Sequence, residues 1–327
     1  MRVDLLGERK LIELLTEKLY RNKSIISGAG EDDAALLKFN GKQLALTSDI
    51  MFHSTHFPPS MKSQQIGRKI AVANLSDLAA VGAKPLGMLF SFGIPPQLDF
   101  RILRGIIKGI NLTCSEYNAP FIGGDTKKAK ELTICGIALG EIIGKPMRRC
   151  NAREGDIVAV TGEIGDAFLG LRIVKEGVDS KKYEKLKNAF LNPKARVREG
   201  IAIAELGVRA AGMDITDGLL FSAGEIARMS RVCLSLDSEK IPISKEAEEF
   251  TEKHEISRKT LLNNGEDYEL IITLSEREFE KVRKKVTGVG GELIEIGRAI
   301  EGRGVLLDGR KVNTNGYDSF INKRKGF

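Results

Sequence analysis

The sequence predicts an α/β fold with α+β character, divided into two domains. The chain has 327 residues, which is about twice the length of a common domain. Segments with the two-residue period of strands alternate with segments of helical period, and no internal repeat is present. A polar stretch at 148–155 separates two such series. We therefore expect an N-terminal domain over 1–148 and a C-terminal α/β domain over 149–327.

In the first half, spaced leucines predict an amphipathic helix over 4–22. Strands are expected over 35–39, 43–47, 86–94 and 132–143, a strand end at 121–126, and a helix over 100–117. The acidic groups near 32–33 and 48–49 are expected at strand edges, where side chains from several elements can converge. The two histidines at 53 and 56 are expected in the loop that follows.

The stretch 65–85 has apolar residues at helical spacing, but Asp77 interrupts them. A carboxylate on a helix face of small residues is costly unless a cation or a hydrogen-bond donor meets it. Two interpretations are open. Asp77 lies within a helix and shares a metal ion with other acids, or it caps a short helix, Leu78–Val81, after a break.

In the second half, strands are expected over 156–161, 233–236, 270–274 and 292–300, with a hairpin at 305–312. Helices are expected over 166–174, 195–206, 220–229, 245–254 and 276–286. The glycine-bearing turn at 162–165 precedes a helix and could hold phosphate on its amides. It lacks the spacing of the known phosphate-binding loops, so a plain strand–turn–helix unit is the preferred interpretation.

The composition narrows the classes of function. A net charge of +7 suits an anionic partner, but Trp is absent and no stretch combines basic with aromatic residues, so no nucleic-acid partner is expected. No apolar run approaches the length of a membrane span, and the N-terminus reads as a helix and not as a signal peptide. Four separated cysteines predict neither disulfides nor a zinc site, and a reducing cytoplasm is expected.

Carboxylates recur at turns beside glycine and at strand ends. They are Asp32, Asp33, Asp49, Asp125, Asp214, Asp217, Glu266 and Asp267, with Asp77 on the expected helix. Hard oxygen ligands without histidine or thiolate suit Mg²⁺, and Mg²⁺ commonly accompanies phosphate. Each acid alone could be a turn residue or a helix cap. Taken together, they predict metal-bridged phosphate chemistry.

Several motifs resemble those of the thiamine-monophosphate kinase family. They are 30–35, Ser48-Asp49, NLSDLAA at 74–80, GGDT at 123–126, DITDGL at 214–219, GEDYEL at 265–270 and GYDSF at 316–320. The acidic motifs at large are shared with aminoimidazole ribonucleotide synthetase, selenophosphate synthetase and the hydrogenase maturation dehydratase. The NLSDLAA, GEDYEL and GYDSF segments favour the thiamine enzyme.

The resemblance implies a homodimer that pairs through the N-terminal sheets, with ATP bound between the two domains and several Mg²⁺ ions along its phosphates. The implied metal ligands are Asp33, Thr47, Ser48, Asp49, Asp77, Asp125, Asp214 and Asp217. The implied ATP contacts are Gly124, Asp125, Arg149 and Thr216, and the implied thiamine monophosphate contacts are His56, Glu266 and Tyr317. A tyrosine can stack on an aromatic ring and a glutamate can accept from a pyrimidine edge; a core tyrosine and a solvated glutamate are the alternatives.

Three positions depart from the family pattern. Glu31 replaces the glycine before the paired aspartates, which leaves open whether Asp32 or Asp33 is the ligand. Asn264 replaces a glycine and could reshape the substrate loop. Thr216 replaces the commoner serine and keeps the hydroxyl group.

The reaction that the resemblance implies is in-line transfer of the ATP γ-phosphoryl group to the phosphate of thiamine monophosphate. The acceptor oxygen is already anionic, so neither a strong base nor a covalent nucleophile is expected; positioning and Mg²⁺ would do the catalysis. One alternative is another enzyme of the superfamily, similar to aminoimidazole ribonucleotide synthetase. A second is a nucleotide- or nucleic-acid-binding regulatory protein, suggested by the +7 charge. Selenophosphate synthesis is disfavoured, because the glycine-rich N-terminal stretch holds no Cys or Lys.

Overall fold

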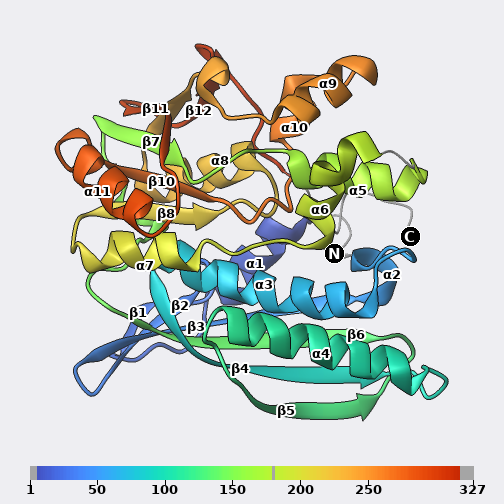
Figure 1. Ribbon diagram of the computed structural model, residues 1–327. Helices are drawn as coiled ribbons and strands as arrows, with labels where there is room; N and C mark the ends of the chain where they lie inside the picture. The colour runs from blue at the N-terminus through green and yellow to red at the C-terminus, as the bar shows by residue number, and fades with distance from the viewer. Residues whose placement is uncertain (1–5, 179–180, 317–327) are drawn as a thin grey trace.

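The structure is a computed structural model that describes residues 6–178 and 181–316. It contains two β-sheets, one from each half of the chain, with helices between and around them (Figure 1). The predicted class, an α/β fold with α+β character in two domains, is confirmed. Strands of the first sheet end at Ile142 and those of the second begin at Asp156. The expected boundary between 148 and 149 falls in this interval and stays a prediction.

The first sheet has six strands in the order β1-β2-β3-β6-β4-β5. The strands are β1 (Ile25–Ser27), β2 (Ala35–Phe39), β3 (Lys42–Phe52), β4 (Ala83–Ile94), β5 (Phe121–Lys128) and β6 (Thr133–Ile142). Neighbours are antiparallel except β4 and β5, which are parallel. Alternate residues face opposite sides, so Met51 and Phe90 are buried beneath helices while Ile50 on the other face is 53% exposed.

The helices of the first half are α1 (Glu8–Thr16), α2 (His53–His56), α3 (Ser63–Val81) and α4 (Phe100–Glu116). Helix α3 is continuous through Asp77, so the helical interpretation is confirmed and the break before Leu78 is wrong. Helix α1 is shorter than the expected 4–22. The expectation that Asp49 lies at a strand edge is also wrong, because β3 continues to Phe52 and places Asp49 within the strand.

The second sheet has seven strands in the order β13-β12-β9-β11-β7-β10-β8. They are β7 (Asp156–Val160), β8 (Ala210–Asp214), β9 (Cys233–Leu236), β10 (Leu270–Ser275), β11 (Ile294–Ile300), β12 (Gly304–Leu307) and β13 (Arg310–Lys311). Strands β12 and β9 are parallel and the other pairs antiparallel, which makes the sheet mixed. Sequence periodicity did not predict β8, because its residues are buried on both faces and show no alternation.

The helices of the second half are α5 (Asp166–Glu176), α6 (Glu184–Leu191), α7 (Val197–Glu205), α8 (Leu219–Ser230), α9 (Lys245–Lys253), α10 (Arg258–Leu262) and α11 (Glu276–Gly288). At the start of α5, the amides of Gly165 and Ala167 donate to the Asp267 carboxylate at 2.9 and 3.2 Å. This helix N-terminus is therefore capped by the protein itself, in agreement with the plain strand–turn–helix interpretation.

Helix α3 lies between the two halves and packs closely on both sides. A Cβ added to Gly67 would lie 2.1 Å from the Ile106 carbonyl oxygen of α4. On the opposite side, a Cβ on Gly200 of α7 would lie 2.2 Å from the Ala79 carbonyl oxygen. Small residues thus let α3 approach both neighbours, and α3 lies at the junction of the two domains (Figure 1). Asp77 belongs to this helix. Within the described chain, no helix has the length and apolar character needed to cross a membrane.

Candidate metal and phosphate site

A cavity of about 790 Å³ lies where the two halves meet. Four aspartates from different elements line it: Asp33 before β2, Asp49 on β3, Asp77 on α3 and Asp214 at the end of β8. Carboxylate oxygens of Asp33, Asp77 and Asp214 all lie within 4.8 Å of one another. Such close carboxylates repel, so the arrangement is suited to a bound cation.

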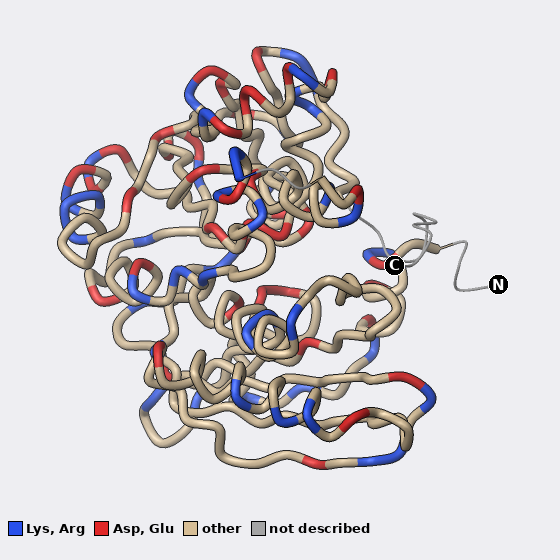
Figure 2. Tube along the Cα trace, turned by 45° about the vertical axis from the view of Figure 1, so that its right-hand side comes forward, with Lys and Arg blue, Asp and Glu red and all other residues tan. Residues whose placement is uncertain are grey.

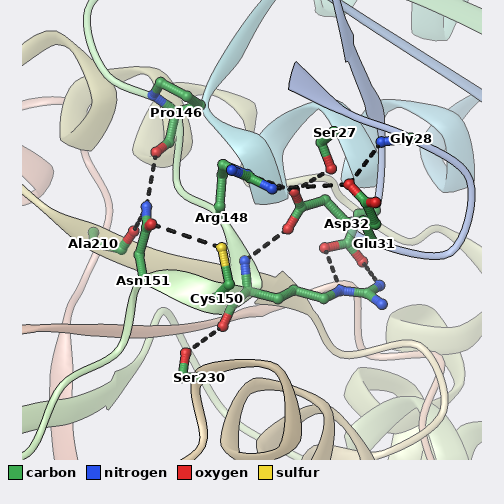
Figure 3. Close-up of polar contacts among 12 residues, drawn as sticks. Ser27, Gly28, Glu31, Asp32, Pro146, Arg148, Cys150, Asn151, Ala210 and Ser230 are labelled. Carbon is green, nitrogen blue, oxygen red and sulfur yellow. Dashed lines mark hydrogen bonds and ion pairs between the residues drawn. The ribbon is translucent and has the colours of Figure 1, made fainter. Parts of the chain in front are cut away.

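Arg149 and Asp33 form one of the polar links between the two halves of the chain. The Arg149 guanidinium donates to the Asp33 carboxylate at 2.6 Å from Nη2 and 3.3 Å from Nε. On the other side of Arg149, its carbonyl oxygen accepts from Ser230 Oγ at 2.6 Å (Figure 3). The residue expected to contact ATP is therefore fixed beside the acids before any ligand arrives.

The structure distinguishes the two neighbouring aspartates that the sequence left open. The Asp32 carboxylate accepts hydrogen bonds from Ser27 Oγ at 2.5 Å, the Arg149 amide at 2.8 Å and Arg148 Nε at 3.0 Å (Figure 3). Protein donors thus occupy both of its oxygens. Asp33 is the member of the pair that joins the acid cluster, and Asp32 supports the turn and the 148–151 segment.

Hydroxyl groups orient the remaining acids. Thr47 Oγ1 donates to the Asp77 carboxylate, and Ser76 Oγ donates to Asp214 at 2.7 Å. The Thr216 hydroxyl lies 3.4 Å from the other Asp214 oxygen. These neutral donors fix the direction of each carboxylate without cancelling its charge.

The electrostatics of the cavity favour a further positive charge. Burial, followed by the neighbouring acids, raises the pKa of Asp77 and of Asp214 well above the usual range. Burial also raises the pKa of Asp49 to about 6, and the pKa of Asp33 is raised in spite of Arg149. Asp49 Oδ2 is buried and has no hydrogen-bond partner in the described chain. An all-oxygen donor set of this kind fits Mg²⁺.

Most of the expected metal and nucleotide residues line this cavity. They are Asp33, Thr47, Ser48, Asp49, Asp77, Arg149, Asp214, Thr216 and Asp217. Ser48 differs from its neighbours because strand alternation turns its side chain to the open face of the sheet, where its Oγ lies 3.4 Å from Cys135 Sγ. The N-terminal helix α1 also lines the cavity through Arg9 and Lys10, which sequence analysis did not identify.

Gly124 and Asp125 lie apart from the acids of the same chain. They border a smaller apolar pocket of about 320 Å³ beside Phe90 and Phe121. In the sheet, Asp49 pairs with Gly136, which pairs with Phe90, which pairs with Gly124. Three strand spacings therefore separate Asp49 from Gly124, or about 14 Å.

Two of the three residues expected to contact the thiamine substrate, His56 and Glu266, lie in a second region. Glu266 forms an ion pair with Lys69 of α3, a residue that sequence analysis missed. The backbone N–H of Phe52 donates to His56 Nδ1 at 3.1 Å, and burial lowers the His56 pKa, so this ring is neutral at pH 7. Tyr317 lies outside the described residues.

A tight turn connects this second region to the acid cluster. Glu266 and Tyr268 have left-handed φ angles of +74° and +55°, and their amides donate to the carbonyls of Thr216 and Ile215 at 2.8 and 3.1 Å. The neighbouring Asn264 side chain donates to the Thr260 carbonyl at 2.7 Å, at the end of α10. The GEDYEL turn is therefore braced on the segment that carries Asp214.

Two family models match the chain: AIR synthase related protein, N-terminal domain, over 31–142, and AIR synthase related protein, C-terminal domain, over 153–308. Fold and acid-lined cavity thus define a two-domain protein of the AIR synthase related class. Thiamine-monophosphate kinase of Pyrococcus horikoshii is 38% identical over 278 residues, with 84% of each chain covered. Thiamine-monophosphate kinase of Aquifex aeolicus is 32% identical over 325 residues, with 98% of this chain and 100% of that protein covered. The chain belongs to the thiamine-monophosphate kinase family.

A solved structure described as AaThiL complexed with AMPPCP and TMP has the same fold. Its TM-score is 0.88 at 31% identity, and the match covers 98% of this chain and 99% of that chain. The similarity therefore extends over both domains.

Proposed function

We propose that this protein transfers the γ-phosphoryl group of ATP to thiamine monophosphate, giving thiamine diphosphate and ADP. The observation that carries the proposal is the cluster of Asp33, Asp49, Asp77 and Asp214 in one interdomain cavity, in a member of the thiamine-monophosphate kinase family. The structure with AMPPCP and TMP supports the pairing of these two ligand types. A phosphorylated small molecule also suits the charge distribution, because Lys and Arg are interspersed with Asp and Glu along the described chain (Figure 2).

The four aspartates, with Thr47, would hold Mg²⁺. The partnerless Asp49 Oδ2 and the raised pKa values of the cluster support this assignment. Bound Mg²⁺ supplies positive charge that reduces the repulsion between donor and acceptor phosphates. We assign Asp217 and Ser48, which border the same cavity, to the edge of the metal and nucleotide site.

Arg149 and Thr216 would position the ATP phosphates. The Arg149 guanidinium is already oriented by Asp33, and it presents a planar charge of the kind that binds phosphate well. Thr216 keeps the hydroxyl of the commoner family serine and lines the cavity. The cavity volume of about 790 Å³ lies within the range of small-molecule sites.

A homodimer would complete the site. The open face of the first sheet exposes apolar side chains, namely Ile50 (53%), Phe52 (37%), Leu86 (42%) and Ile122 (60%). A second copy packed on this face would cover them. Ser48 and Asp125 belong to the same sheet, and Asp125 cannot reach the acids of its own chain. We therefore assign the contact of Gly124 and Asp125 with ATP and metal to the site of the neighbouring subunit.

The chemical step needs positioning more than acid–base catalysis. An anionic oxygen of the thiamine monophosphate phosphate attacks the γ-phosphorus, and the bond to the β–γ bridging oxygen breaks, so that ADP leaves with that electron pair. No proton has to be removed from the acceptor. His56, whose ring is neutral, therefore serves in binding, as does Glu266. No phosphorylated side chain forms.

The experiment that tests the proposal combines purified protein, Mg²⁺, ATP and thiamine monophosphate, with each component omitted in turn. We expect equal amounts of thiamine diphosphate and ADP, and no product without Mg²⁺. Mg²⁺-dependent ATP binding without thiamine diphosphate would instead favour a ribonucleotide substrate, as for an aminoimidazole ribonucleotide synthetase-like enzyme.

The four described cysteines are free, which suits the reducing cytoplasm expected from the sequence.

A further inference from the structure

Lys69 is a buried cation that the phosphoryl-transfer chemistry does not use. It lies on α3, two helical turns before Asp77, and its side chain is 1% exposed. Its ammonium group pairs with Glu266 Oε2 and lies 4.3 Å from the centroid of the Phe190 ring. A buried ammonium is stable only when it is paired in this way, so Lys69 and Glu266 form one unit.

The two partners of the ion pair differ in solvent exposure. Lys69 is enclosed between α3 and Phe190, whereas the Glu266 side chain is 28% exposed. Lys69 occupies Oε2, and Oε1 accepts no hydrogen bond from the described residues. The Glu266 amide is bonded to the Thr216 carbonyl at 2.8 Å, which fixes the main chain at this position. The geometry leaves a single oriented carboxylate oxygen as an acceptor.

His56 adds a donor near this acceptor. The Phe52 amide donates to His56 Nδ1 at 3.1 Å, and on this contact we assign the proton of the neutral ring to Nε2. The charges of Glu266 and Lys69 both act on the His56 pKa, so the three side chains belong to one region. An acceptor and a donor in one region are complementary to an aminopyrimidine edge, which offers an amino donor next to a ring-nitrogen acceptor.

We infer that Lys69 is a positioning residue for substrate recognition: its ion pair holds the Glu266 carboxylate in the orientation in which Oε1 accepts from the amino group of the substrate pyrimidine. The inference rests on the proposed function and deepens it. Replacing that amino group by an oxo group places a carbonyl opposite the carboxylate, and two acceptors repel. The Lys69–Glu266 pair thereby selects aminopyrimidines over oxopyrimidines.

The test compares thiamine monophosphate with its oxopyrimidine analogue as substrates. The variants are Lys69→Met, Lys69→Arg, Glu266→Gln and the double variant Lys69→Met/Glu266→Gln. Lys69→Met should raise KM for thiamine monophosphate about 10- to 100-fold and reduce the amino/oxo selectivity by a similar factor, with KM for ATP unchanged. Lys69→Arg, which keeps the charge, should retain part of the selectivity.

The double variant separates positioning from a general structural role. If Lys69 acts through Glu266, Lys69→Met adds less than about twofold in KM to Glu266→Gln alone. Arg68→Met is the matched control, because it removes the adjacent α3 cation, whose guanidinium binds Glu116 and the Pro193 carbonyl and not Glu266. That control should leave the amino/oxo selectivity unchanged.

The inference is overturned if Lys69→Met keeps the wild-type selectivity, or if the two substitutions multiply in the double variant. If Lys69→Met does not fold, unchanged selectivity in Glu266→Gln overturns it equally. Failure of the proposed function has a different signature, namely a wild-type protein that forms no thiamine diphosphate. Calorimetric binding of the two pyrimidine compounds in Mg²⁺ and a non-hydrolysable ATP analogue then still decides the role of Lys69.

Discussion

Asp77 lies in the middle of a closely packed helix, yet its carboxylate lies among three other acids. The charge of Asp77 does not stabilise the fold, because burial and the neighbouring carboxylates raise the Asp77 pKa. Asparagine has nearly the same shape and can still accept from Thr47. We expect Asp77→Asn to lower turnover at least about 100-fold, while its melting temperature in EDTA equals or exceeds that of the wild type.

Calorimetry with and without Mg²⁺ measures this second quantity. The Mg²⁺-dependent rise in melting temperature should be much smaller in Asp77→Asn than in the wild type. Near-normal turnover in the variant would show that the acids do not act on one metal site.

The buried Asp49 carboxyl should make the free energy of unfolding of the metal-free protein depend on pH. Burial raises its pKa from 3.8 to about 6, so between these values the folded chain holds a proton that the unfolded chain has lost. This group therefore lowers the free energy of unfolding as pH rises through that window, and the loss persists above it. At pH 8 in EDTA, Asp49→Asn should be more stable by about 1–3 kcal/mol, and at pH 4 the difference should vanish. A variant less stable than the wild type at pH 8 would contradict this account.

At the scale of elements, α3 positions the acid cluster by close contacts with α4 and α7. Gly67→Ala would place a methyl group against the Ile106 carbonyl oxygen, so we expect a loss of about 2 kcal/mol or more in the free energy of unfolding. Gly288→Ala is the matched control, because this exposed glycine at the end of α11 has open space around its Cβ position. That control should gain about 0.5–1 kcal/mol. Urea unfolding compares the two, and equal effects would refute the close-packing argument.

Local sequence patterns predicted most of the helices and strands, because amphipathic periodicity indicates a half-buried helix or strand. They did not predict β8, whose residues are buried on both sides, or the length of β3 beyond Thr47. The choice between Asp32 and Asp33 depended on Arg148 and Arg149, more than 100 residues away, which no local pattern can show. Sequence analysis did not identify Lys69, because its partner Glu266 lies 197 residues further along the chain.

At the scale of the whole molecule, one chain does not bring Asp125 to the acids that it was expected to join. The proposed homodimer would account for this separation, and it makes a quantitative prediction. Asp125→Asn and Asp77→Asn should each be inactive alone, but a mixed dimer should contain one site with both native aspartates. Random co-assembly should restore about a quarter of wild-type turnover, since half of the dimers are mixed and each has one intact site.

Co-expression with two different affinity tags and assay of the mixed population measure this restoration. Ile50→Lys, which places a charge on the open face, should shift the protein to monomer in analytical ultracentrifugation. Turnover of the mixed population no higher than that of the separate variants would show that Asp125 does not act between subunits.

The most direct test follows the phosphoryl group itself. The protein is incubated with Mg²⁺, thiamine monophosphate and ATP whose γ-phosphoryl oxygens carry a heavy isotope, and thiamine diphosphate is fragmented in a mass spectrometer. We predict that the label lies only in the terminal phosphate of the product, that none remains on the protein, and that none is transferred by Asp77→Asn. Unlabelled thiamine diphosphate, label trapped on a side chain, or label released only as inorganic phosphate would contradict direct transfer at the acid-lined cavity.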